Sequence, residues 1–355
     1  MDQALLLSKL NDHYNRTLPF IAFKLPYSDI VFCYLQKDAT VHTTTTFKEE
    51  SFIFAPFAFN GTAHCIPSEG SEVIKYEMPK EILKQIPVSV KEDPTEKARY
   101  TKLVTEAIDK IKTGNVHKIV VSRPQEVRLK TFDLSLLFER IMHLYPTALS
   151  YIWYHPETGL WSGASPEVLI YTEGTSFTTM ALAGTQKVNK NGINHWSAKE
   201  HEEQQFVTDA ITTSLQKITA VLKVSKTTTH RAGTVAHLRT DITGILKNST
   251  ATLPKVCSVL HPTPAVCGTP RDNARNFIQN KEGYDRSFYT GFLGPVCEQE
   301  KSSNLFVNLR CMKIADDVAT LYVGGGITRS SVAEHEWEET RNKLQTMLQV
   351  LAPML

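Results

Sequence analysis

Apolar segments in this sequence occur in runs of short strands rather than in regular alternation with helices. Within the first ninety or so residues they include FIAFKL, IVFCYL and SFIFAPFAF, with turns between them. An antiparallel meander with turns at HPETG and TEGT is expected over residues 148–185. Runs of strands favour antiparallel sheets over the parallel sheet that strict strand–helix–strand alternation builds. The pattern therefore predicts an α+β layered fold.

Helices are expected at four places between these strands. An amphipathic helix is predicted over residues 95–113, where Gly114 provides the stop, and Asp133 is predicted to cap a helix that runs to Tyr145. The other two are a long helix over residues 197–223 and a final helix over residues 334–352. Further strands are expected at KIVVSR and at residues 236–242, 304–314 and 319–324, and residues 86–97 are the candidate linker.

The charge and cysteine patterns exclude several classes of protein. The formal net charge of the 355-residue chain is +2, and no Lys/Arg run marks a nucleic-acid surface. The six cysteines form no C-x-x-C pair and no cluster with zinc spacing, so free thiols in a reducing, cytoplasmic setting are expected. MDQALLLSKL does not resemble a signal peptide, and no apolar stretch is long enough to span a membrane. Neither a nucleic-acid nor a membrane partner is therefore expected.

Paired carboxylates on two predicted helices are the first chemical signal. Glu200 and Glu203 are three residues apart and share a helix face, and Glu336 and Glu339 repeat this spacing. Lys343 follows on the same face as Glu339. Four carboxylates on two helices are suited to a hard cation such as Mg²⁺, which prefers oxygen ligands. The alternative is that KEHEEQQ and AEHEWEE are solvated acidic faces.

Two segments and two cations give weaker signals. Gly324, Gly325 and Gly326 follow the strand TLYV, and the two prolines of HPTPA stiffen residues 261–265. The glycines suggest a backbone that lies close to another group, with a plain turn as the alternative. The prolines suggest a rigid pocket wall, with a mere connection as the alternative. Arg310 lies within the apolar segment LFVNLRCMKI, where a cation is costly unless it meets an anion, and a structural ion pair is the alternative. Lys118, at the start of KIVVSR, raises the same question.

These pieces occur together, in one order, in a known family. The order is KIVVSR, SGASPEVL, ALAGT, E-x-x-E, HL-x-T, LHPTPAVCG, EGYDR-x-x-Y-x-G, NLRC, GGGI and EWEET-x-x-K. The chain from about residue 95 onward resembles the chorismate-utilising enzymes, which include isochorismate synthases, salicylate synthases, and component I of anthranilate and aminodeoxychorismate synthases. The resemblance implies two antiparallel β-sheets with flanking helices and an active site between the sheets. It favours a single catalytic domain over residues 1–355, with residues 1–92 as its divergent, strand-rich part.

The resemblance also implies the ligands of a metal ion. Glu203 and Glu339 match the glutamates that bind Mg²⁺, and Glu200 and Glu336 match acids that help through water or support those ligands. The metal would hold the ring carboxylate of chorismate. Lys343 would add positive charge near that carboxylate.

The substrate contacts implied by the resemblance lie on several segments. Arg310 matches the residue that grips the enolpyruvyl carboxylate, with Tyr289 beside it. His237 matches a histidine close to the ring. The remaining implied contacts are Gly184, Thr185, Ala265, Val266, Gly324, Gly325 and Gly326.

Members of the family differ mainly in the nucleophile that attacks the ring, and Lys118 indicates which nucleophile is used here. Members that use water carry a lysine at the position of Lys118, whereas members that use ammonia carry glutamine. A neutral Lys118 would take a proton from the water that attacks C2, and a protonated Glu167 would protonate the departing C4 hydroxyl. The pKa values of both groups would have to be shifted toward neutrality.

The sequence therefore favours isochorismate synthase, an isomerase that uses Mg²⁺ and needs no glutaminase subunit. Ala183 stands where aminodeoxychorismate synthases carry a lysine, and no tryptophan-sensing motif of anthranilate synthases is found. Salicylate synthase shares the same residues and remains the main alternative. A non-catalytic paralogue would be expected to lose a metal acid or the acid/base pair. The product would enter menaquinone or siderophore biosynthesis.

Overall fold

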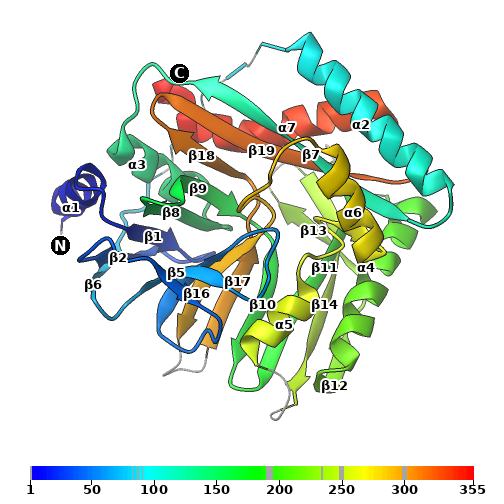
Figure 1. Ribbon diagram of the computed structural model, residues 1–355, viewed down its shortest axis with the longest axis horizontal. Coiled ribbons are helices and arrows are strands. Elements are labelled where there is room, and N and C mark those ends of the chain that lie inside the picture. The colour runs from blue at the N-terminus through cyan, green and yellow to red at the C-terminus, as the bar shows by residue number, and fades with distance from the viewer. Residues whose placement is uncertain are drawn as a thin grey trace.

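Two antiparallel sheets with helices on their outer faces make up the described chain (Figure 1). The computed structural model describes residues 2–81, 83–84, 86, 88–89, 91–188, 195–232, 235–247, 252–297 and 302–355. Among these residues, no helix is long and apolar enough to cross a membrane. The helices are α1 (Gln3–Asn15), α2 (Pro94–Lys112), α3 (Leu134–Leu144), α4 (Ala198–Gln216), α5 (Leu253–Leu260), α6 (Arg271–Lys281) and α7 (Ala333–Leu351), followed by a 3₁₀ turn at Ala352–Met354.

The nine-stranded sheet has the order β15-β7-β19-β18-β9-β8-β1-β2-β6. Its strands are β1 (Phe20–Lys24), β2 (Ile30–Gln36), β6 (Ser71–Glu77), β7 (Lys118–Arg128), β8 (Leu149–His155), β9 (Gly159–Ser165), β15 (Gly268–Thr269), β18 (Cys311–Ala315) and β19 (Val318–Ile327). The long pairing of β7 with β19 aligns Val120 with Gly326 and Ser122 with Gly324. This register sets the KIVVSR and GGG segments side by side.

The ten-stranded sheet has the order β12-β14-β11-β10-β17-β16-β4-β5-β3, with β13 paired to β14. Its strands are β3 (His42–Thr44), β4 (Ser51–Ala55), β5 (Ala63–Pro67), β10 (Val168–Glu173), β11 (Ser176–Lys187), β12 (Thr219–Val224), β13 (Thr228–Ala232), β14 (Val235–Leu246), β16 (Phe292–Cys297) and β17 (Ser302–Val307). Both sheets are antiparallel at every described pairing, such as β11 with β14, as predicted.

Aromatic side chains fill the space between the sheets. Trp153 and Trp161 from the nine-stranded sheet meet Phe54 and Phe306 from the ten-stranded sheet in one fully buried cluster. Phe54 packs 5.1 Å from Trp153 and 6.0 Å from Trp161, measured between ring centroids. Because large rings stabilise a core through the area that they bury, this cluster fixes how the two sheets lie against each other.

The helices cover the outer faces of the sheets. α1, α3 and α7 pack on the nine-stranded sheet, and α4 and α5 pack on the ten-stranded sheet. α2 and α6 form a further core with β7. Local sequence explains the helix starts. The Asp133 carboxylate accepts a hydrogen bond from the Leu136 backbone, as predicted, and Asp93 caps α2 ahead of Pro94.

The structure corrects several sequence predictions. Residues 148–185 are two hairpins in different sheets, because the chain crosses between β9 and β10. Residues 304–314 divide in the same way into β17 and β18. The helix predicted over 197–223 ends at Gln216, since β-branched residues follow and pair as β12. α1, α5 and α6 were not predicted, while α2, α3 and α7 lie within one or two residues of their predicted bounds.

The two crossings between sheets lie side by side. One runs from Ser165 to Val168 and the other from Val307 to Cys311. The Val307 amide donates to the Glu167 carbonyl (2.9 Å), and the Ala164 amide donates to the Arg310 carbonyl (3.0 Å). Ser165 adds a hydrogen bond from its hydroxyl to the Val307 carbonyl. Glu167 and Arg310 are therefore placed by backbone bonds between these two segments.

Candidate active site

Nearly all of the candidate site residues identified in the sequence line one cavity of about 230 Å³. It lies where the two crossings, α4, α7 and the β7–β19 pair meet. The predicted residues that line it are Lys118, Glu167, Gly184, Glu200, Glu203, His237, Ala265, Val266, Tyr289, Arg310, Gly324, Gly325, Gly326, Glu336, Glu339 and Lys343. Thr185 belongs to β11, but its side chain lies outside the described part of the structure.

Lys118 begins β7 and extends over the neighbouring strand. Its side chain is largely buried, and its Nζ donates a hydrogen bond to Glu203 Oε1 at 2.9 Å. A Cβ atom on Gly326 would lie 2.8 Å from Lys118 Cε. Glycine at this position therefore leaves the space through which the lysine reaches the cavity.

The three consecutive glycines are part of β19 rather than of a turn. A Cβ on Gly325 would lie 3.0 Å from Glu336 Oε2, and one on Gly324 would lie 3.2 Å from the Tyr289 hydroxyl. Lys343 Nζ also donates to the Gly324 carbonyl at 2.8 Å. The prediction that this backbone lies close to other groups is correct, and the plain-turn alternative is wrong.

Glu167 is a buried carboxyl group in the crossing between β9 and β10. Burial raises its pKa from 4.5 to about 7, although nearby Lys118 and Lys343 act to lower it. A carboxyl with a pKa near neutrality can hold a proton and release it to a leaving group. This direction of the shift agrees with the prediction for Glu167.

Glu203 and Glu339 enter the cavity from different helices, and each meets a lysine. Glu203 pairs with Lys118, and Glu339 Oε1 accepts from Lys343 Nζ at 2.6 Å. The ammonium group of Lys343 lowers the pKa of Glu339 and keeps it ionised. Both side chains therefore present carboxyl oxygen atoms to one cavity.

Glu200 has a structural role that the spacing argument did not anticipate. Its carboxylate accepts hydrogen bonds from the Ser197 amide (2.7 Å) and the Ser197 hydroxyl, which completes a capping box at the start of α4. Gln186 donates to its other oxygen at 3.2 Å. Burial raises the pKa of Glu200, but these hydrogen bonds outweigh it and lower the pKa overall.

The acidic side chains fit a magnesium ion that keeps other ligands of its own. Within the described ranges, no three His, Cys, Asp or Glu side chains are grouped as a closed metal site. Mg²⁺ is commonly held by one or two carboxylates, with water and substrate oxygens completing its octahedron. Glu203 and Glu339 could supply those carboxylates, and Glu336 lines the same cavity.

Arg310 lies between β17 and β18 rather than inside a strand, which corrects the prediction. Its φ of 47° places it in the left-handed region, and its Nη1 donates to Thr346 Oγ1 at 3.1 Å. Among the described residues it forms no ion pair, so the structural ion-pair alternative is wrong. Burial lowers the pKa of its guanidinium. A cation placed in this way favours an anionic ligand.

His237 is a neutral side chain at the wall of the cavity. Burial is the main cause that lowers its pKa to about 4. Its Nδ1 lies 3.1 Å from the Gly184 carbonyl, which only accepts, so Nδ1 carries the proton. Gly184 permits this contact with a φ of 66°. Ala265 and Val266, after the HPTP segment, also line the cavity, as predicted.

A buried ion pair behind the cavity was not predicted as a functional feature. Arg286 and Glu282 are each only 1% exposed at their side chains. Arg286 donates to the carbonyls of Val266 (2.9 Å) and Val120 (2.7 Å), both of which line the cavity. The sequence could have indicated this ion pair, because an acid and an arginine stand four residues apart in the EGYDR motif.

Comparison with known proteins gives a consistent result. The family model for chorismate binding enzymes matches residues 45–352, which reaches further toward the N-terminus than the predicted motifs. The chain is 32% identical over 270 residues to isochorismate synthase DhbC of Bacillus subtilis, covering 71% of this chain and 67% of that protein. It is 30% identical over 265 residues to isochorismate synthase EntC of Escherichia coli K12, covering 72% and 67%.

Solved structures agree on the fold. A Bacillus anthracis protein named as a candidate 2,3-dihydroxybenzoate-specific isochorismate synthase, DhbC, superposes with a TM-score of 0.80 at 26% identity, over 98% of this chain and 99% of that one. Anthranilate synthase component I of Streptococcus pneumoniae shares the fold alone, with a TM-score of 0.66 at 16% identity over 92% and 90%. With the family model matching most of its length, this chain belongs to the chorismate-binding enzyme family.

Proposed function

We propose that this protein is an isochorismate synthase, an isomerase that moves the hydroxyl group of chorismate from C4 to C2. The observation that carries the proposal is that one cavity holds both Lys118 and a protonatable Glu167, together with Arg310, which forms no ion pair within the described residues. The activity named for its relatives at 30% and 32% identity supports it. The pathway, menaquinone or siderophore biosynthesis, follows from those relatives only as part of this proposal.

In the proposed reaction, the neutral form of Lys118 removes a proton from a water molecule as the water oxygen bonds to C2. The ring double bonds shift, the C4–O bond breaks, and Glu167 gives its proton to the departing hydroxyl, which leaves as water. Arg310 binds the enolpyruvyl carboxylate through charge-assisted hydrogen bonds, and Tyr289 lies beside it. His237, protonated at Nδ1 and neutral, lines the cavity where the ring would lie.

Mg²⁺ is the proposed cofactor, held by Glu203 and Glu339. When bound, it would neutralise the ring carboxylate of chorismate and fix the position of the ring. Lys343 adds positive charge through its contact with Glu339, and Glu336 assists from the same helix. Glu200 takes part through the N-terminus of α4, which its capping box holds in place. The single catalytic domain, the cytoplasmic location and the independence from a glutaminase subunit remain predictions.

Salicylate synthase is the second candidate, because it would use the same acid, base and metal acids before eliminating pyruvate. The test is to incubate purified protein with chorismate and Mg²⁺ and separate the products by chromatography. Isochorismate without pyruvate is the expected result. Equal amounts of salicylate and pyruvate would favour the lyase, and no turnover of chorismate with intact folding would favour a binding paralogue.

A further inference from the structure

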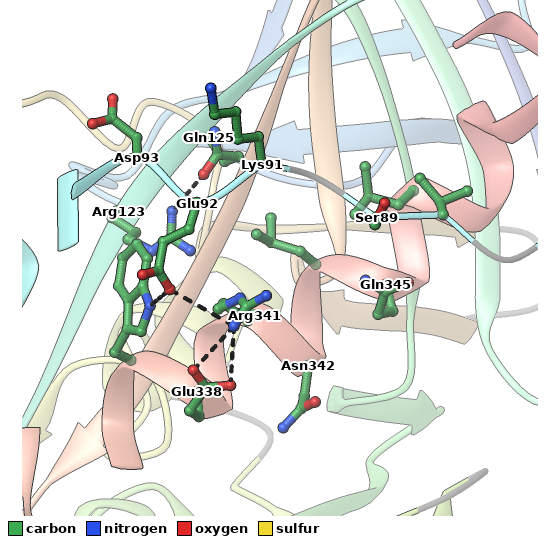
Figure 2. A pocket seen from close by; sticks show the side chains of 14 residues that line it. Ser89, Lys91, Glu92, Asp93, Arg123, Gln125, Glu338, Arg341, Asn342 and Gln345 are labelled. Carbon is green, nitrogen blue, oxygen red and sulfur yellow. Dashed lines mark hydrogen bonds and ion pairs between the residues drawn. The ribbon is translucent and has the colours of Figure 1, made fainter. Parts of the chain in front are cut away.

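A second cavity lies on the far side of α7 from the candidate active site. Its volume is about 240 Å³, and α7, β7, residues 88–89 and residues 91–93 form its walls (Figure 2). α7 presents Glu336, Glu339 and Lys343 to the active site and turns Trp337, Arg341 and Leu344 toward this cavity. The helix is therefore shared by two cavities with different linings.

Arg123 supplies a buried cation to this second cavity. The residue is 2% exposed, and its guanidinium lies over the Trp337 ring at 4.1 Å from the centroid. Its hydrogen bonds go to uncharged groups, from Nε to Thr340 Oγ1 (3.1 Å) and from Nη1 to Gln125 Oε1 (2.9 Å). Across the described ranges, no carboxylate forms an ion pair with Arg123. Burial lowers its pKa to about 10, in keeping with a cation that lacks a counterion.

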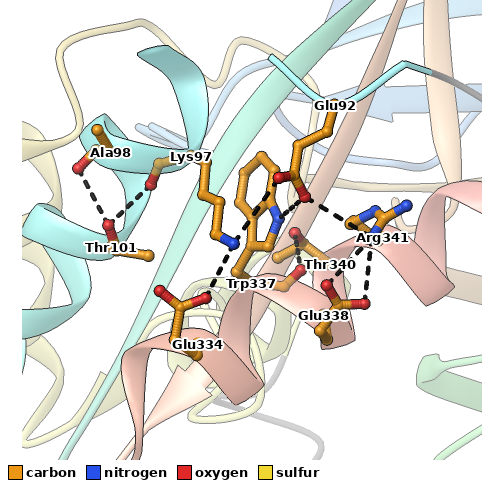
Figure 3. A network of polar contacts seen from close by, with 9 residues as sticks. All are labelled: Glu92, Lys97, Ala98, Thr101, Glu334, Trp337, Glu338, Thr340 and Arg341. Atoms are coloured by element: carbon orange, nitrogen blue, oxygen red, sulfur yellow. Dashed lines mark hydrogen bonds and ion pairs between the residues drawn. The ribbon is translucent and has the colours of Figure 1, made fainter. Parts of the chain in front are cut away.

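The carboxylates around the cavity already have partners (Figure 3). Glu92 accepts from Trp337 Nε1 at 3.0 Å and pairs with Lys97 and with Arg341, each at 3.7 Å. Glu338 pairs with Arg341 at 3.1 Å. Asp93 caps α2 through the Thr95 amide at 2.8 Å. Of the cations that line the cavity, Arg341 is paired, whereas Arg123 and Lys91 form no ion pair within the described chain.

The geometry points to a binding site for a small organic carboxylate with an apolar body in the cavity lined by Arg123, Trp337 and Leu344. The carboxylate would complete the hydrogen bonding of the Arg123 fork, for which a planar anion is the matching partner. Val88, Leu344 and Leu348 offer an apolar wall for the rest of the ligand. A compact dianion such as phosphate fits less well, because Glu92, Asp93 and Glu338 line the same cavity.

The test uses the whole protein, labelled with ¹⁵N at tryptophan, with benzoate as the probe. The indole N–H signal of Trp337 is identified by its loss in Trp337→Phe and followed during titration at constant ionic strength. We expect benzoate to shift this signal in a saturable way. Benzamide, which has the same shape without the charge, and inorganic phosphate should bind at least about tenfold more weakly.

Variants locate the effect. Arg123→Gln should weaken benzoate binding at least about tenfold, whereas Lys110→Gln on the exposed face of α2 should leave it unchanged. Arg310→Gln controls for benzoate in the active site and should keep the Trp337 shift. The inference is overturned if benzamide binds as tightly as benzoate, if wild-type protein shows no saturable shift, or if Arg310→Gln abolishes it. If Arg123→Gln does not fold, the comparison of benzoate with benzamide decides. Binding is measured without turnover, so its failure leaves the proposed function untouched.

Discussion

Lys118 and Glu203 lie 85 residues apart in the sequence, yet their side chains form a 2.9 Å ion pair across the candidate active site. The pair joins the proposed base on β7 to a proposed metal ligand on α4. The Glu203 carboxylate therefore contacts the proposed base and is also a proposed ligand of the metal. A change at Lys118 should therefore affect the chemistry more than the binding of substrate.

Lys118→Ala should abolish the addition of water while chorismate binding stays measurable. Loss of a general base typically costs about 10²–10⁴-fold in rate. The measurement is kcat by product chromatography, together with chorismate affinity by calorimetry. Lys110→Ala, an exposed lysine of α2, is the matched control. Near-normal turnover in Lys118→Ala would refute the assignment of the base.

Glu167 predicts how activity depends on pH. Its pKa of about 7 means that the protonated acid is lost as pH rises through neutrality, so kcat/KM should fall on the alkaline side. Glu167→Gln should remove most of the activity at every pH. Glu173→Gln, at the exposed end of β10, should not alter the profile. An activity that keeps rising well above pH 7 would contradict the role of Glu167.

The same residue predicts how stability depends on pH. The folded-state pKa of about 7 lies above the unfolded value of 4.5, so the native state binds the proton more tightly. This contribution to stability is fully present below pH 4.5 and is lost as pH rises through 7. The free energy of unfolding of Glu167→Gln should therefore equal that of the wild type at pH 4.5 and exceed it by about 3 kcal/mol at pH 8. Urea unfolding at the two pH values measures these free energies. The same difference between variant and wild type at both pH values would contradict the raised pKa of Glu167.

Glu203→Gln and Glu339→Gln should each remove Mg²⁺ binding and activity together. Neutralising a carboxylate ligand weakens a site that relies on one or two such groups. Mg²⁺ binding is measured by calorimetry, and activity is measured with EDTA and after Mg²⁺ is restored. Glu202→Gln, an exposed neighbour on α4, should behave as wild type. Full activity of the native protein in EDTA would show that the metal proposal is wrong.

Glu282→Gln should destabilise the whole fold. It leaves the buried Arg286 without its counterion, which typically costs about 3–5 kcal/mol. The surface pair of Glu106 with Lys281 provides a matched control, and Glu106→Gln should cost less than about 1 kcal/mol. Chemical denaturation measures both free energies of unfolding. Similar small losses in the two variants would contradict the role assigned to the buried pair.

The sequence predicted those features that rest on local pattern. Periodicity and capping located α2, α3 and α7, and the i, i+3 spacing of Glu336 and Glu339 placed both on the cavity side of α7. The order of the motifs, through the family resemblance, predicted that Lys118, Glu167 and Arg310 belong to one site, and all three line the same cavity. The glycine run was recognised as a place of close approach, and the Lys118 side chain explains it.

Features that depend on tertiary structure could not be predicted. Strand periodicity does not say which sheet a strand joins, so the crossings after β9 and β17 were missed. The ion pair between Lys118 and Glu203 joins distant segments, and no local pattern encodes it. The spacing from Glu203 identified Glu200 as a candidate metal acid. Glu200 also completes an S-x-x-E pattern, which encodes the capping box that it forms.

The two crossings between the sheets have a consequence for engineering. Glu167 and Arg310 hold their separation through backbone bonds between neighbouring segments, so inserting even one residue there would move both chemical groups at once. The tight turn between β10 and β11, at the exposed residues 173–176, lies at the other end of β10 and positions neither Glu167 nor Arg310. Tags or reporter peptides inserted at that turn should be tolerated, whereas a single added residue at either crossing should silence the enzyme.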